Sequence, residues 1–92
     1  LVFSVAQNSP NPFGRRTRID YTLPHEVPVV LRVYNSAGRV VSTLVDAKQK
    51  PGRYAVSWDV SEVPEFRLPA GTYFYRLEAG EFAAIRKMVK ME

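Results

Sequence analysis

The sequence has 92 residues, of which 46% are hydrophobic and 24% are charged, with a formal net charge of +4. This length and balance are those of one small folded domain with a single modest core, and they exclude a disordered chain. No apolar run approaches the ~18 residues of a membrane span, so we expect no membrane insertion. Because cysteine is absent, disulfides, thiolate metal sites and cysteine nucleophiles are excluded.

The first half of the chain has a hydrophobic period of two residues, which indicates β-strands rather than helices. Residues 1–7 are a possible first strand. Apolar and polar side chains alternate in residues 18–23, and Pro24 ends this second strand. Residues 29–35 alternate in the same way and predict a third strand.

A hairpin and a further strand follow. Asn and Ser in the NSAG stretch, residues 35–38, can bond their own backbone and Gly adopts a positive φ readily, so we predict a turn. Residues 39–45 return as a strand, and the polar residues 46–52 predict a connection. Residues 53–58 alternate again, with the aromatic side chains expected to point inward.

The last third predicts a loop and a second hairpin. Residues 59–71 contain two prolines and no sustained period, so we expect a loop that crosses between two sheets, with room for one short turn. Residues 72–79 and 82–90 alternate like strands around a tight turn at Gly80 and Glu81. About seven short strands without an amphipathic helix predict an all-β fold, an immunoglobulin-like antiparallel β-sandwich.

The aromatic residues divide into core and surface candidates. Four of them occupy the alternate positions expected to face the core: Trp58, Tyr54, Tyr73 and Tyr75. Phe74 and Tyr34 fall on the other side of their strands and are the candidates for an exposed surface. An exposed aromatic ring can stack on a sugar ring, so these two residues are possible carbohydrate contacts.

The sequence offers little for catalysis or metal binding. The single histidine, His25, lies between two prolines on an expected exposed turn, and a catalytic triad needs a better placed base. Asp20, Asp46 and Asp59 are isolated and lack the closely spaced oxygen ligands of a calcium loop. We therefore predict that the protein is not an enzyme and uses no metal or other cofactor.

The positive charges fall into two groups near the ends of the chain: Arg15, Arg16 and Arg18, and Arg86, Lys87 and Lys90. Nucleic-acid readers usually combine such groups with a recognition helix or a run of stacking aromatics, and neither is visible. We interpret these residues as solvated or edge-strand side chains, because edge-strand charges discourage aberrant strand pairing. No nucleic-acid partner is expected.

Four segments follow one another at a characteristic spacing: QNSPNPFGRRTRIDYTLP, VVLRVYNSAGRVVSTLV, PGRYAVSWD and LPAGTYFYRLEAGEFAAIRKMVK. Together they cover almost the whole chain, and they resemble the C-terminal sorting domain of proteins exported by the bacterial type IX secretion system. The same series is similar, more loosely, to the immunoglobulin-like module of flagellar hook-capping proteins.

The first resemblance implies that residues 1–92 are one domain, the tail of a larger secreted cargo protein of a Gram-negative bacterium. The start at Leu1, without Met or a leader, likewise suggests a fragment or trimmed product, with any export signal upstream. The type IX translocon would recognise the tail in the periplasm, and a sortase would then attach the cargo to the cell surface. The resemblance implies five recognition residues: Gly71, Tyr73, Gly80, Lys87 and Lys90.

Two functions therefore remain open. The first is a non-catalytic sorting signal, whose partners are the translocon and the sortase and whose location is the periplasm in transit, then the cell surface or medium. The alternative is a passive immunoglobulin-like binding or structural module of a larger extracellular protein, which binds carbohydrate or helps its parent protein to assemble.

Overall fold

A computed structural model of the chain describes residues 1–62 and 68–92. In chain order, its elements are β1 (Ser4–Val5), β2 (Arg16–Leu23), β3 (Val27–Asn35), β4 (Val40–Gln49), β5 (Gly52–Asp59), the short 3-10 helix η1 (Val60–Glu62), β6 (Gly71–Ala79) and β7 (Phe82–Lys90). No helix in this part of the chain is long and apolar enough to cross a membrane.

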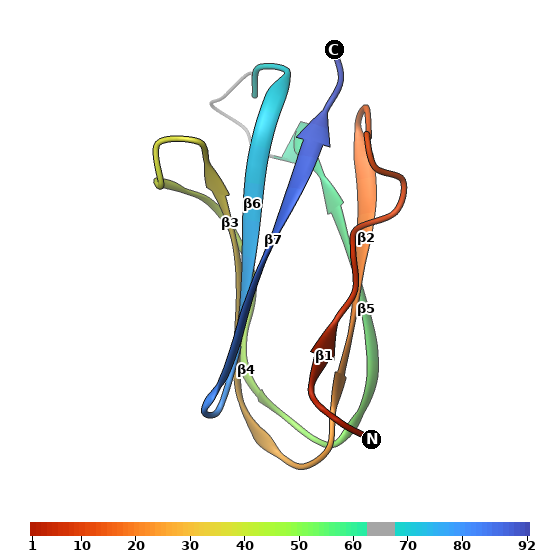
Figure 1. Cartoon of the computed structure of the whole chain (residues 1–92), viewed down its shortest axis with the longest axis vertical. Helices are drawn as coiled ribbons and strands as arrows, with labels where there is room; N and C mark the ends of the chain where they lie inside the picture. Colours follow the sequence, from red (N-terminus) through yellow and green to blue (C-terminus); the bar gives the residue numbers. More distant parts are fainter. Residues whose placement is uncertain (63–67) are drawn as a thin grey trace.

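The strands form two antiparallel sheets that face each other (Figure 1). A three-stranded sheet has the order β1-β2-β5, and a four-stranded sheet has the order β4-β3-β6-β7. The predicted immunoglobulin-like antiparallel sandwich of about seven short strands is therefore confirmed. The predicted crossing of the loop after β5 is confirmed as well, because β5 and β6 belong to different sheets.

Two strand boundaries differ from the sequence prediction. Residues 46–49, expected in a connection, belong to β4 and pair with residues 27–30 of β3. Three of these four residues are exposed, because β4 is at an edge of its sheet, where polar side chains are tolerated. β1 is shorter than the predicted 1–7, since its regular pairing with β2 stops after residue 6. The chain bonds β2 once more, between Ser9 and Arg18, before it reaches the other sheet at Phe13.

The loop predicted over residues 59–71 is described only in part. It begins with η1, which is the short turn that the sequence allowed for. Residues 63–67 lie outside the described residues. The predicted turn at residues 35–38 is confirmed: Asn35 Oδ1 accepts hydrogen bonds from the amides of Ala37 and Arg39, each at 3.0 Å, and Gly38 has a φ of 83°.

The core fills the space between the inward faces of the two sheets, because alternate residues of each strand point to the same side. Trp58, Tyr73 and Tyr75 are at most 3% exposed, so the prediction that they are core residues is confirmed. Tyr54 is half-buried and stacks on Tyr21, with the ring centroids 5.2 Å apart. Burial of a large apolar side chain contributes roughly 1.5–3 kcal/mol, so these rings are major sources of stability.

The N-terminal segment, which we define as residues 5–13, passes from one sheet to the other. At its start, Val5 pairs with Tyr21 of β2 in the three-stranded sheet. At its end, Phe13 forms a parallel bridge to Lys90 of β7 in the four-stranded sheet. This segment therefore joins the two sheets along the side formed by β1 and β7.

Backbone and side-chain groups of the N-terminal segment bind the outer edge of β7. Gln7 Nε2 donates a hydrogen bond of 2.7 Å to the carbonyl oxygen of Lys87. The amide of Val89 donates to Asn11 Oδ1 at 2.9 Å, and the amide of Phe13 donates to the carbonyl of Val89 at 3.0 Å. The last residues of β7 are thus hydrogen-bonded on both sides.

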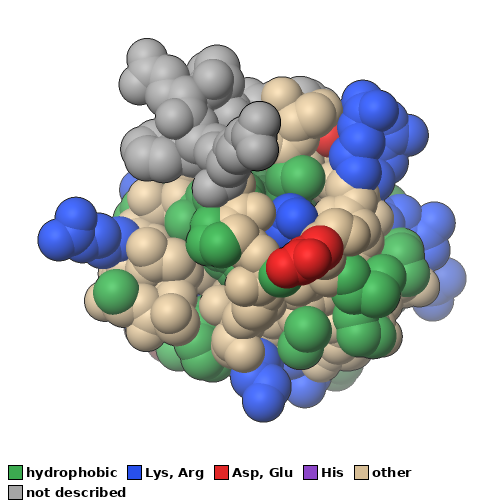
Figure 2. Space-filling view, turned by 90° about the horizontal axis from the view of Figure 1, so that it is seen from above, with side chains coloured by type: hydrophobic (Ala, Val, Ile, Leu, Met, Phe, Trp, Pro, Cys, Tyr) green, Lys and Arg blue, Asp and Glu red, His purple; other side chains and the backbone are tan. Residues whose placement is uncertain are grey.

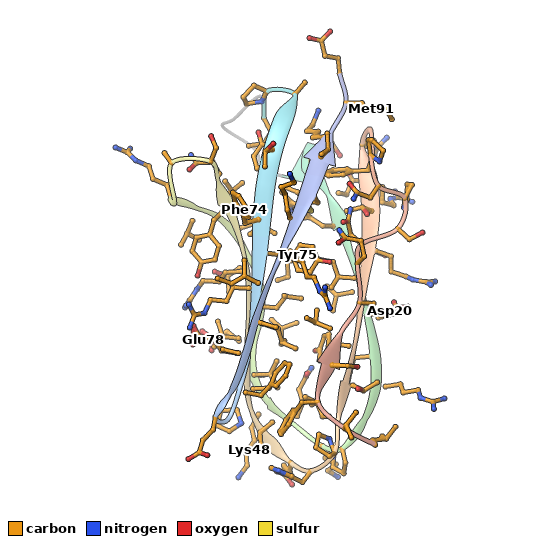
Figure 3. The ribbon with its side chains drawn as sticks, viewed as in Figure 1. Asp20, Lys48, Phe74, Tyr75, Glu78 and Met91 are labelled. Atoms are coloured by element: carbon orange, nitrogen blue, oxygen red, sulfur yellow. The ribbon has the colours of Figure 1, made fainter. Side chains whose placement is uncertain are left out.

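Inward side chains of the four-stranded sheet also bind this segment. The hydroxyl of Tyr75 donates a hydrogen bond of 2.6 Å to the carbonyl of Ala6, and Figure 3 shows Tyr75 directed into the space between the sheets. Arg86 Nε and Nη2 donate to the carbonyl of Val5 at 3.2 and 3.1 Å. The carbonyls of Val5 and Ala6 have no other partner among the described residues, so these side chains satisfy their hydrogen-bonding capacity.

Candidate functional site

The outer face, which we define as the solvent side of β3, β6 and β7, carries both surface aromatics that the sequence singled out. Tyr34 on β3 lies directly opposite Phe74 on β6, and both side chains are half-buried. Figure 3 shows Phe74 and Tyr75 on opposite sides of β6. Lys87 of β7 lies opposite Phe74 and is exposed. Directly opposite side chains are roughly 4.5–5.5 Å apart at Cβ, so the three residues form a row across the strands.

A second row beside the first carries charge. Arg32 of β3 lies opposite Arg76 of β6, which in turn lies opposite Ile85 of β7. Two like charges at opposite positions repel each other, and Glu78 offsets this repulsion with an ion pair to Arg76, Nε to Oε1, of 3.0 Å. Arg32 has no ion-pair partner among the described residues.

The outer face thus carries two aromatic side chains with the cationic side chains of Arg32, Arg76 and Lys87 beside them. The side chains of Arg32 and Lys87 can donate hydrogen bonds to hydroxyl or carboxylate oxygens. The face of an aromatic ring can pack on the CH face of a sugar. The outer face therefore has the chemistry to bind an extended polar chain such as a polysaccharide.

The five residues implied by the first resemblance do not form one surface. Gly71 and Lys90 lie opposite each other at one end of the β6–β7 hairpin, while Gly80, with a φ of 60°, forms the turn at its other end. Lys87 lies between these ends on the outer face. Tyr73 faces the core, where its ring lies 6.3 Å from that of Trp58.

Two of these residues border a hollow at one end of the sandwich. The hollow has a volume of about 550 Å³ and lies between the β3–β4 turn and residues 68–73, with Arg39, Gly71 and Tyr73 in its lining. Figure 2 looks onto this end of the molecule and shows Lys and Arg side chains that project at several points around it, without forming one patch.

The family model of the FlgD Ig-like domain matches residues 8–81, which is more than half of the chain. The chain belongs to this family. The match supports the looser of the two resemblances found in the sequence, that to the immunoglobulin-like module of flagellar hook-capping proteins. No curated protein matches the chain in sequence. The matched residues end at the turn before β7, so Lys87 and Lys90 lie outside them.

A charged cluster in this FlgD Ig-like domain was missed by the sequence analysis. Asp59, predicted to be isolated, accepts hydrogen bonds at both carboxylate oxygens from Arg15 Nε, each 3.1 Å long. Arg16 Nη2 donates at 3.2 Å, and the amide and hydroxyl of Ser61 donate at 2.9 and 2.6 Å. The prediction was wrong because the pairing of β2 with β5 brings Arg16 opposite Asp59, and a separation of 43 positions leaves no local pattern.

The remaining candidates for site chemistry stay apart from one another. Asp20 was also predicted to be isolated, but it forms an ion pair with Arg18, Nε to Oδ1, of 3.0 Å. His25 is exposed and contacts the ring of Phe3 edge-on, at 5.2 Å between centroids. Across residues 1–62 and 68–92, no three His, Asp or Glu side chains lie close enough together to hold a metal ion.

The hydrogen bonds to Asp59 make the stability of the FlgD Ig-like domain dependent on pH. Donation from the Ser61 hydroxyl, then from Arg15, holds the pKa of Asp59 well below its ordinary value of 3.8. Because the folded-state pKa is lowered, the carboxylate stabilises the fold at pH values above the unfolded-state pKa. This contribution is lost as the pH falls from about 4 toward the folded-state pKa.

Asp59→Asn is therefore expected to be destabilising at neutral pH and progressively less so, relative to the wild type, below about pH 4. Urea unfolding at a series of pH values from about 2 to about 8 measures the difference. Asp46→Asn is the matched control, since Asp46 is exposed and has no ion pair with a described residue. A difference between Asp59→Asn and wild type that does not change with pH would contradict this account.

Proposed function

We propose that this FlgD Ig-like domain is a passive, non-catalytic module of a larger extracellular protein and that its outer face binds a polysaccharide. The row of Tyr34, Phe74 and Lys87 is the observation that carries this proposal. The core does not need these two aromatic rings, because they lie on the solvent side of strands whose inward positions are filled by buried residues. Half-buried aromatics on a sheet face are available to a ligand.

The shape of the surface favours an extended ligand. The rows cross three adjacent strands, which lie about 4.8 Å apart, so the aromatic and cationic side chains are spread over a width of roughly 10 Å. A polysaccharide chain lying across the strands can place one sugar ring on an aromatic ring and the hydroxyls of another near Arg32 or Lys87.

The test measures retention of the 92-residue chain on insoluble glucans. Phe74→Ala and Tyr34→Ala are each expected to reduce the affinity about fivefold, because one stacking contact contributes on the order of 1 kcal/mol. Met91→Ala removes an apolar side chain that is 50% exposed outside the outer face, and it should leave retention unchanged. Wild-type chain that is not retained, or retention that survives both aromatic substitutions, would refute the proposed binding surface.

A second candidate function is the sorting signal for the type IX secretion system that the first resemblance implies. The observation that favours it is the position of β7 at an edge of its sheet, with Arg86 and Lys87 exposed. An edge strand with cationic side chains can be bound by a partner with an acidic groove or a free sheet edge. In this proposal the translocon and sortase are the partners, and the domain passes through the periplasm to the cell surface.

Residues 1–92 fused to a fluorescent reporter behind a signal peptide test this second function, in bacteria with and without an intact type IX translocon. Display on the cell surface only in the intact strain is the expected result, and Lys87→Glu should lower it strongly. Lys50→Glu changes an equally charged exposed residue outside β7 and is the control. A substitution is preferable to deleting the last residues, because Met88 is fully buried. Reporter that stays in the periplasm of both strains would contradict a sorting role.

A further inference from the structure

We propose that the open half of β7, residues 82–86, pairs with the same strand of a second copy of this chain. The two copies would be related by a twofold axis, and their four-stranded sheets would become one continuous sheet. This inference goes beyond the proposed function, because it concerns the edge of the sheet rather than its outer face.

The open half is defined by backbone groups that have no partner. In an antiparallel strand, the amide and carbonyl of one residue point to the same side, and every second residue uses the same side. Lys87 and Val89 direct these groups away from β6, toward the N-terminal segment. Ile85 and Ala83 follow the same alternation, so their amides and carbonyls also point away from β6. No described residue binds them.

Figure 1 shows why the two halves of β7 differ. The backbone of the strand converges with the N-terminal segment only toward its arrowhead. In the first half of β7, side chains alone reach the other sheet: Arg86 binds the carbonyl of Val5, and the ring of Phe82 stacks on that of Phe3. Gln7, which binds the carbonyl of Lys87, is the first residue of the segment to reach the backbone of β7. The edge is therefore covered from Lys87 onward and open before it.

The side chains of the open half do not protect it. Natural edge strands are usually blocked by outward charges, prolines or bulges. The opposite edge strand, β4, has two register shifts against β3, whereas β7 pairs with β6 in one uninterrupted register from Phe82 to Lys90. The outward side chains of the open half are Ala83 and Ile85, and Ile85 is 60% exposed. This edge is regular, uncharged at these two positions and apolar.

The free backbone groups fix the register of the pairing. If Ala84 lies opposite Ala84 of the second copy, Ala83 lies opposite Ile85, and each such pair can exchange two hydrogen bonds. All the free amides and carbonyls of Ala83 and Ile85 are then used. A register shifted by two residues would place either Ile85 opposite the β6–β7 turn or Ala83 opposite Lys87. The carbonyl of Lys87 already accepts a hydrogen bond from Gln7.

Charge favours a second copy of this chain as the occupant. The same register brings Glu81 opposite Lys87 of the second copy, and the twofold axis produces this pair twice. Both residues are exposed, and neither has an ion-pair partner among the described residues. Arg86 lies opposite Phe82, so no like charges oppose each other. The two Ile85 side chains are diagonal neighbours, within roughly 7–8 Å, where they can be partly covered.

Sedimentation equilibrium of the 92-residue chain from about 10 µM to about 1 mM tests the proposal, because this range spans the affinities of small interfaces. We expect reversible dimerisation. Ile85→Pro removes an outward amide that β6 does not use, so it should give a folded monomer, with folding checked by near-UV circular dichroism. A wild-type chain that stays monomeric, or a dimer unaffected in a folded Ile85→Pro variant, would overturn the proposal and leave the edge to an extended segment of a different protein.

A charge exchange tests the register. Glu81→Lys and Lys87→Glu, each alone, turn two attractive pairs into repulsive ones and should weaken the dimer about tenfold. The double variant restores both pairs with their signs exchanged, and it should dimerise as the wild type does to within about threefold. Lys50→Glu controls for the change in net charge. Single variants without effect, or a double variant as weak as the single ones, would exclude this register.

Discussion

Hydrogen bonds between the N-terminal segment and β7 tie the two sheets together along one side of the sandwich. The segment begins beside β2 and ends beside β7, so it joins two sheet edges that would otherwise be separate. The side chains of Gln7 and Asn11 substitute for backbone groups of a neighbouring strand. The crossing also places the fully buried ring of Phe13 against Trp58, at 5.8 Å between centroids. β7 is placed in its sheet by the uninterrupted pairing with β6, and the crossing ties the last residues of β7 to the other sheet.

The outer face and the open half of β7 both exist because a small domain buries only part of its side chains and strand edges. Its single core uses the inward positions of both sheets, and the outward aromatics Tyr34 and Phe74 remain for a ligand. The N-terminal segment bonds the backbone of β7 only from Lys87 onward, so the backbone of Ala83 and Ile85 remains for another strand. The match to the FlgD Ig-like domain family ends at residue 81, before the strand that carries the open edge.

Local alternation predicted the strands, the sandwich and three of the four core aromatics, because one buried face leaves a period of two in the sequence. It could not predict contacts between distant residues. Asn11 and Val89 are 78 residues apart, and the cluster around Asp59 depends on the register of β2 with β5. Tyr34 and Phe74 were each predicted to be surface residues, but only the strand order, with β3 beside β6, shows that they are neighbours.

The N-terminal segment divides β7 into a covered half and an open half. Amide hydrogen exchange, measured residue by residue by NMR on a dilute and therefore monomeric sample, tests it directly. The Val89 amide, which donates to Asn11 at 2.9 Å, should be protected, while the Ile85 amide should exchange rapidly. Equal protection of the two amides, or faster exchange at Val89 than at Ile85, would contradict the account.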